Sequence, residues 1–149
     1  MGHISRSVAI RRAPADVFAL LIDVHRLPEW ATTVVETRDL SHPSLQVGCT
    51  FRQAFRLLGR EFDSKWRVTT FEPPHRIAYS ATSTKGGSLE MTQTVRPDGD
   101  GSEVRFDIDY DLPGGLVGQM IDRAGAEQQA GREAERSLRN LRGLLEDDG

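Results

Sequence analysis

One carboxylate, Glu127, lies where a C-terminal helix would otherwise bury an apolar side chain. From Leu116 to Glu146 apolar residues recur every three or four positions, the spacing that turns one helix face toward a core. On that face Gly131 follows Glu127 by one turn, so bulky side chains give way to a carboxylate and to no side chain. Burial would raise the pKa of this carboxyl group, which could then act as an acid or base on an enolisable substrate.

Two interpretations of this gap in the apolar face are open. In the first, Ala124, Glu127, Gly131 and Ala134 form the ceiling of a pocket, and Glu127 is its catalytic residue. In the second, the glycines let the helix bend, and Glu127 turns outward to solvent. A Glu127→Gln variant separates them, because only the first expects a loss of turnover or ligand affinity at an unchanged melting temperature.

Aromatic, amide and thioether side chains alternate along the strands that precede this helix. If the face that carries Phe106 is the covered one, the following residues share it: Gln53, Trp66, Tyr79, Met91, Gln93, Phe106 and Tyr110. Such a set suits a mainly apolar ligand that carries carbonyl or hydroxyl groups. The alternative is an ordinary core, in which the tyrosine and glutamine tips reach water at the border of the sheet.

The elements that would position these side chains follow from periodicity and turn residues. Strands are expected at 5–10, 34–40 and, as an antiparallel meander, from 47 to 110, because apolar and polar residues alternate there between Gly- and Pro-rich turns. Short helices are expected at 14–22 and 25–30. The order predicts an α+β fold in which a sheet of about seven strands is covered on one face by the long helix at 116–146.

Composition limits the classes of function. The 149 residues fit a single domain spanning 1–149, and 19 basic against 22 acidic residues give a net charge of −3. No nucleic-acid partner and no stable membrane insertion are expected from this balance, and no apolar run reaches the ~20 residues of a membrane span. The single cysteine, Cys49, cannot form an internal disulfide, and the N-terminal residues lack a signal-peptide pattern, so a cytoplasmic location is expected.

Other residue types give weaker indications. His25, His42 and His75 lie near predicted turns and share no ligand spacing, so no metal site and no cofactor are predicted. Cys49 has no neighbouring histidine and is expected to be a small buried residue rather than a nucleophile. The sequence leaves a monomer and a homodimer both open.

Four stretches together resemble the START-like, or SRPBCC, superfamily, in particular its polyketide cyclase/dehydrase branch. They are Ile10-Arg11-Arg12-Ala13-Pro14-Ala15-Asp16-Val17-Phe18, Leu27-Pro28-Glu29-Trp30, Trp66-Arg67-Val68-Thr69-Thr70-Phe71-Glu72-Pro73-Pro74 and Leu138-Arg139-Asn140-Leu141-Arg142. The resemblance covers nearly the whole chain. It implies a helix-grip fold, in which a curved sheet wraps around the C-terminal helix and leaves a deep hydrophobic pocket between them.

Three functions are compatible with that resemblance, since fold alone does not determine activity. The first is binding of a small hydrophobic molecule such as a lipid, an isoprenoid or an aromatic polyketide. The second is a polyketide cyclase/dehydrase, in which Tyr79, Gln93 and Tyr110 would polarise carbonyls and Glu127 would move protons. The third is a non-enzymatic interaction module that uses the surface of the fold.

Overall fold

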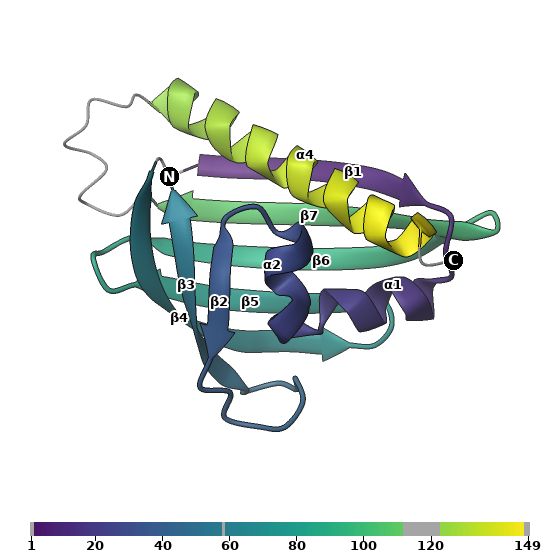
Figure 1. Cartoon of the computed structure of the whole chain (residues 1–149), viewed down its shortest axis with the longest axis horizontal. Coiled ribbons are helices and arrows are strands. Elements are labelled where there is room, and N and C mark those ends of the chain that lie inside the picture. Colours follow the sequence, from purple (N-terminus) through teal and green to yellow (C-terminus); the bar gives the residue numbers. More distant parts are fainter. Residues whose placement is uncertain (1, 58, 112–122, 148–149) are drawn as a thin grey trace.

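The computed structural model describes residues 2–57, 59–111 and 123–147, and within them the chain forms one antiparallel sheet covered by helices (Figure 1). The helices are α1 (Pro14–Leu21), the 3₁₀ helix η1 (Val24–Arg26), α2 (Leu27–Trp30) and α4 (Arg123–Asp147). The strands are β1 (Gly2–Ile10), β2 (Val34–Arg38), β3 (Thr50–Leu57), β4 (Arg60–Glu72), β5 (Arg76–Ser83), β6 (Ser88–Asp98) and β7 (Gly101–Asp111). The α+β helix-grip fold expected from the sequence is confirmed.

The sheet is a meander to which the N-terminal strand returns. Its order is β1-β7-β6-β5-β4-β3-β2, and all neighbours are antiparallel. β1 pairs with β7 from Gly2 opposite Tyr110 to Ile10 opposite Ser102. The register of β4 against β5 shifts between Val68 and Thr70, an irregularity of the kind that bends a strand. The sheet therefore curves, and its concave face turns toward α4 (Figure 1).

The C-terminal half of α4 closes the hydrophobic core. Leu138, Leu141 and Leu145 are buried there, together with the apolar face of α1 and the indole of Trp30. Burying one such leucine stabilises the fold by roughly 1.5–3 kcal/mol. The periodicity that predicted this helix is thus the periodicity of its contact with the core.

Two clamps fasten this end of α4 to the segment between β1 and α1. The backbone N–H of Arg11 donates to Glu146 Oε2 at 3.0 Å, and Arg12 Nη1 donates to the carbonyl oxygen of Leu145 at 2.6 Å. The second bond satisfies a carbonyl that the helix end leaves without an internal partner. The helix direction across the sheet is therefore fixed at its C-terminal end.

An arginine from β1 occupies the gap that the sequence shows at Gly131. A Cβ atom on Gly131 would lie 2.5 Å from Nη2 of Arg6, so the missing side chain is what lets that guanidinium lie against the helix. Arg6 Nε also donates to Glu135 Oε1 at 2.9 Å. At Gly131, the gap in the apolar face of α4 is therefore filled by a side chain from β1.

Part of the predicted long helix cannot be compared with the structure. Residues 116–122 lie outside the described residues, and so does the side chain of Ala124. Within the described helices, none has the length and apolar composition needed to cross a membrane.

Candidate functional site

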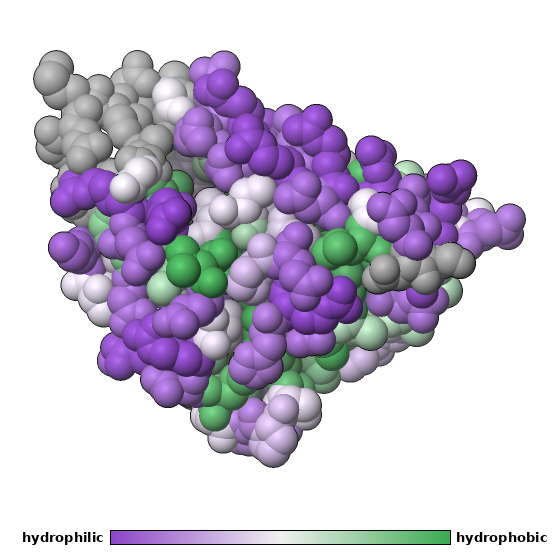
Figure 2. Space-filling view, in the orientation of Figure 1, coloured by the Kyte–Doolittle hydropathy of each residue, from purple (hydrophilic) through white to green (hydrophobic). Residues whose placement is uncertain are grey.

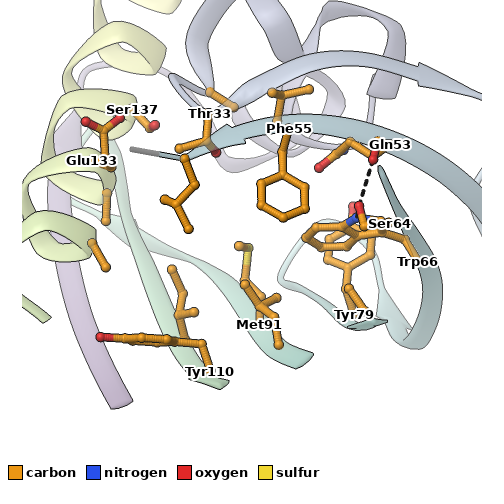
Figure 3. Close-up of a pocket in the computed structure, with 18 of the residues that line it drawn as sticks. Thr33, Gln53, Phe55, Ser64, Trp66, Tyr79, Met91, Tyr110, Glu133 and Ser137 are labelled. Carbon is orange, nitrogen blue, oxygen red and sulfur yellow. Dashed lines mark hydrogen bonds between the residues drawn. The ribbon is translucent and has the colours of Figure 1, made fainter. Parts of the chain in front are cut away.

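A cavity of about 430 Å³ lies between the concave face of the sheet and α4. Strands β3 to β7 form one wall, α4 another, and α2 with the residues that follow it a third (Figure 3). Figure 2 shows hydrophobic residues exposed in a hollow between α2, α4 and the end of β3, with hydrophilic side chains around it. Small-molecule sites typically measure roughly 300–1,000 Å³, so the cavity is of ligand size.

Aromatic rings make up one wall of the cavity. The indole of Trp66 stacks on Phe51 with ring centroids 6.0 Å apart, and it meets Tyr79 edge-on at 5.6 Å. Trp30 of α2 and Phe106 of β7 also pack together, with ring centroids 6.0 Å apart. Rings fixed by one another offer a rigid apolar surface to a flat ligand.

The polar groups next to these rings are hydroxyls and amides. Trp66 Nε1 donates to Ser64 Oγ at 2.9 Å, and Ser64 Oγ donates to the carbonyl oxygen of Gln53 at 2.7 Å. Among the described residues, the amide nitrogen of Gln93 donates only to the sulfur of Met91, at 3.2 Å. Its oxygen Oε1 is buried and has no hydrogen-bond partner among the described residues. A buried acceptor without a partner costs about 1–3 kcal/mol, so a ligand or water that donates to it would be stabilised.

Both tyrosines of the cavity wall are held in their neutral form. Burial raises the pKa of Tyr79, and the neighbouring Cys49 thiol adds to the effect. Burial also raises the pKa of Tyr110, with a smaller contribution from the carboxylate of Glu127. The ring of Tyr110 lies against Gly2, where an added Cβ would come within 2.3 Å of it. At neutral pH both phenols are therefore hydrogen-bond donors rather than bases.

Two acidic residues belong to the described lining of the cavity, Asp111 at the end of β7 and Glu133 on α4. Glu133 Oε2 accepts a short hydrogen bond from Thr32 Oγ1, while Oε1 accepts from Gln129 Nε2 at 3.2 Å and from Arg136 Nη1 at 3.4 Å. The side chain of Glu133 is 17% exposed, against 57% for Arg136. Glu133 and Ser137 face the cavity together from α4 (Figure 3).

The same helix face holds the segment that follows α2. The backbone N–H of Thr32 donates to Ser137 Oγ at 3.0 Å, and Asn140 Nδ2 donates to the carbonyl oxygen of Trp30 at 3.2 Å. Through Glu133, Ser137 and Asn140, the wall formed by α4 is hydrogen-bonded to the wall formed by α2 and the residues that follow it.

The structure brings the predicted sheet residues together. All seven line the cavity: Gln53, Trp66, Tyr79, Met91, Gln93, Phe106 and Tyr110. The residues predicted on the helix are placed differently. Gly131 lies against Arg6, Glu127 is half-buried near Tyr110 without lining the cavity, and the side chain of Ala124 lies outside the described part. A catalytic role for Glu127 stays a prediction.

The sequence did contain a signal for the helix face that lines the cavity. Gln129, Glu133 and Ser137 recur at intervals of four, the spacing of one face. At about 100° per residue, Glu133 in the middle of this polar row is rotated by roughly 100° from Ala134 of the apolar stripe. The stripe faces mainly the core and β1, although Ala134 also lines the cavity, and the polar row faces the cavity.

In the described part of the chain, no three histidine, cysteine, aspartate or glutamate side chains are grouped as metal ligands.

A curved antiparallel sheet gripping a C-terminal helix, with a ligand-sized apolar cavity between them, defines a hydrophobic ligand-binding fold. The chain matches the family described as "Polyketide cyclase / dehydrase and lipid transport" over residues 1–146. It therefore belongs to this family, which confirms the resemblance found in the sequence.

Individual relatives are similar to this protein over nearly the whole length of both chains. The chain is 26% identical over 141 residues to Uncharacterized protein Rv1546 of Mycobacterium tuberculosis, which covers 95% of this chain and 96% of that protein. A crystallised protein from Rhodobacter sphaeroides is 25% identical, with a TM-score of 0.70 over 97% of this chain and 92% of its own. TTHA0849 from Thermus thermophilus shares the fold at 16% identity, with a TM-score of 0.77 over 99% of each chain.

Proposed function

We propose that this protein binds a small, mainly apolar and aromatic molecule in the cavity between the sheet and α4. The observation that carries the proposal is the cavity itself, about 430 Å³ in volume, walled by Phe51, Trp66 and Tyr79. Hydroxyl and amide groups in its lining would orient such a ligand without forming an acid–base pair with one another. The family description, which includes lipid transport, supports the same function.

Native mass spectrometry of protein purified from its own host would weigh whatever co-purifies with it. Thermal unfolding with a panel of lipids, isoprenoids and aromatic polyketides would then test binding. At a ligand concentration of about 100 Kd, stability rises by about 2.7 kcal/mol, which shifts Tm of a chain of this size by about 5–10 °C. An empty protein that responds to no member of the panel would contradict the proposal.

A pair of variants on β6 tests whether the cavity is the binding place. Met91 lines the cavity, so Met91→Trp would fill it and abolish the Tm shift. Glu90, the preceding residue, is exposed, because neighbouring strand residues point to opposite faces. Glu90→Trp is thus the matched control and should keep the shift. Equal loss in both variants would contradict binding in the cavity.

The second candidate function is a polyketide cyclase/dehydrase. The family description and the Glu133 carboxylate in the cavity lining favour it. In this reaction class a base removes a proton next to a carbonyl, an aldol addition closes the ring, and water leaves. Incubation with polyketide extracts distinguishes the two functions, since binding returns intact ligand and catalysis returns a product lighter by one water. Glu133→Gln and Glu127→Gln, compared in that assay, would show which carboxylate moves the proton.

A further inference from the structure

The described lining of the cavity contains no positive charge. Its charged side chains are Asp111 and Glu133, both acidic, and no described lysine, arginine or histidine side chain lines it. An anionic ligand would therefore lose its hydration without gaining a cation from the described lining as a partner.

Glu133 also offers little to a cationic ligand, because its own hydrogen-bonding capacity is used within the protein. Thr32 donates to one of its oxygens, and Gln129 and Arg136 donate to the other. Arg136 lies outside the cavity lining and already offsets the carboxylate charge. The ammonium group of a ligand would have to compete for Glu133 with the guanidinium of Arg136, which already lies beside the carboxylate.

Apart from Asp111 and Glu133, the polar side chains of the described lining are neutral, and they lie on different walls. Gln53, Ser64 and Trp66 gather on the sheet, while Ser137 faces the cavity from α4 (Figure 3). Phe55 and Met91 are drawn between the two groups (Figure 3). A ligand with an apolar middle and neutral hydrogen-bonding groups toward its ends matches this arrangement.

From these observations we infer that the cavity selects an uncharged ligand, an aromatic compound with hydroxyl or carbonyl groups, and rejects the carboxylate or sulfonate of the same skeleton. The inference rests on the proposed binding function and narrows its ligand class. Free fatty acids and other anionic amphiphiles are thereby excluded as ligands.

Two fluorescent dyes with the same aromatic skeleton test this selection. N-phenyl-1-naphthylamine is neutral, and 8-anilinonaphthalene-1-sulfonate adds a sulfonate to it. Titrated into the protein, the neutral dye should bind about tenfold more tightly or better. Both signals should disappear in Met91→Trp, which ties them to the cavity.

A charge variant separates the effect of the cavity from the greater hydrophobicity of the neutral dye. Glu133→Gln removes the negative charge and leaves Arg136 without its partner, so the ratio of the affinity for the sulfonate to that for the neutral dye should rise several-fold. Glu135, on the same helix, pairs with Arg6 and does not line the cavity. Glu135→Gln is therefore the control and should leave both affinities unchanged.

The outcomes distinguish the inference from the function on which it rests. Equal binding of the two dyes, or tighter binding of the sulfonate, would overturn charge selection and leave the binding function standing. A Glu133→Gln variant with an unchanged ratio of affinities would also overturn it. If neither dye nor any ligand of the panel binds, the binding function fails, and the inference fails with it.

Discussion

At the scale of single residues, Tyr79 both lines the cavity and contributes to stability. Its phenol is buried against Phe51 and Trp66, and burial raises its pKa above the ordinary value of 10.0. Because the folded state favours the neutral phenol, the stability that depends on Tyr79 is complete below about pH 10 and is lost as pH rises above it. Urea unfolding between about pH 9 and about pH 11 should therefore show a steeper loss for the wild type than for Tyr79→Phe. Parallel curves for the two proteins would contradict a buried Tyr79.

Two glycines of α4 form a second residue-scale test. Replacing a helical glycine by alanine stabilises by about 1 kcal/mol where space allows, and Gly143 has no atom within 4 Å of an added Cβ. At Gly131 the same change displaces the Arg6 guanidinium from its place beside Glu135. That surface ion pair contributes about 0.2–1 kcal/mol, which offsets the helix gain. Chemical denaturation should therefore show Gly143→Ala clearly stabilised and Gly131→Ala nearly unchanged, and equal gains would contradict the Arg6 contact.

The placement of the sheet residues could be predicted from the sequence, whereas the spacing of Gln129, Glu133 and Ser137 shows only that they share a helix face and not that this face meets the cavity. Strand alternation assigns a residue to a face without further information, so Gln53, Trp66 and Tyr110 could be grouped on the concave face. A helix offers several faces, and which one meets the cavity depends on the angle at which the helix crosses the sheet. That angle is set by contacts such as Arg12 with Leu145, which join residues far apart in the sequence.

At the scale of elements, α4 has two functions along its length. Its C-terminal half completes the core through Leu138, Leu141 and Leu145, and the turns before it face the cavity. The apolar periodicity in the sequence is strong because the core half requires it. The cavity half requires shape and hydrogen bonding instead, which a hydrophobic pattern does not reveal.

The contact between α4 and the segment after α2 predicts a local effect. Ser137→Ala removes the acceptor of the Thr32 backbone N–H, which should lower the free energy of unfolding by about 1–3 kcal/mol. Hydrogen exchange resolved by residue should show faster exchange at Thr32, while the amide of Val104 in β7 stays protected. Unchanged exchange at Thr32 would mean that Ser137 does not hold this segment.

At the scale of the whole molecule, the fold is closed by the two ends of its chain. β1 pairs along β7, and α4 returns across the same end of the sheet, so residues near positions 6 and 135 meet. This closure explains why the order of elements in the sequence was sufficient to predict the fold class. A one-sided apolar meander needs a cover, and in this chain the C-terminal helix is the segment long enough to supply it.

Removal of residues 138–149 tests that closure directly. The deletion takes away three buried leucines, Leu138, Leu141 and Leu145, each stabilising by roughly 1.5–3 kcal/mol, and also both clamps to the β1–α1 segment. Since a domain is stable by only about 5–15 kcal/mol in total, the shortened chain should show no cooperative urea transition by circular dichroism. Leu141→Ala in the full chain, which costs about 2–5 kcal/mol, should keep a cooperative transition at lower urea. A shortened chain that unfolds cooperatively would show that the sheet and the remaining helices are stable without the C-terminal half of α4.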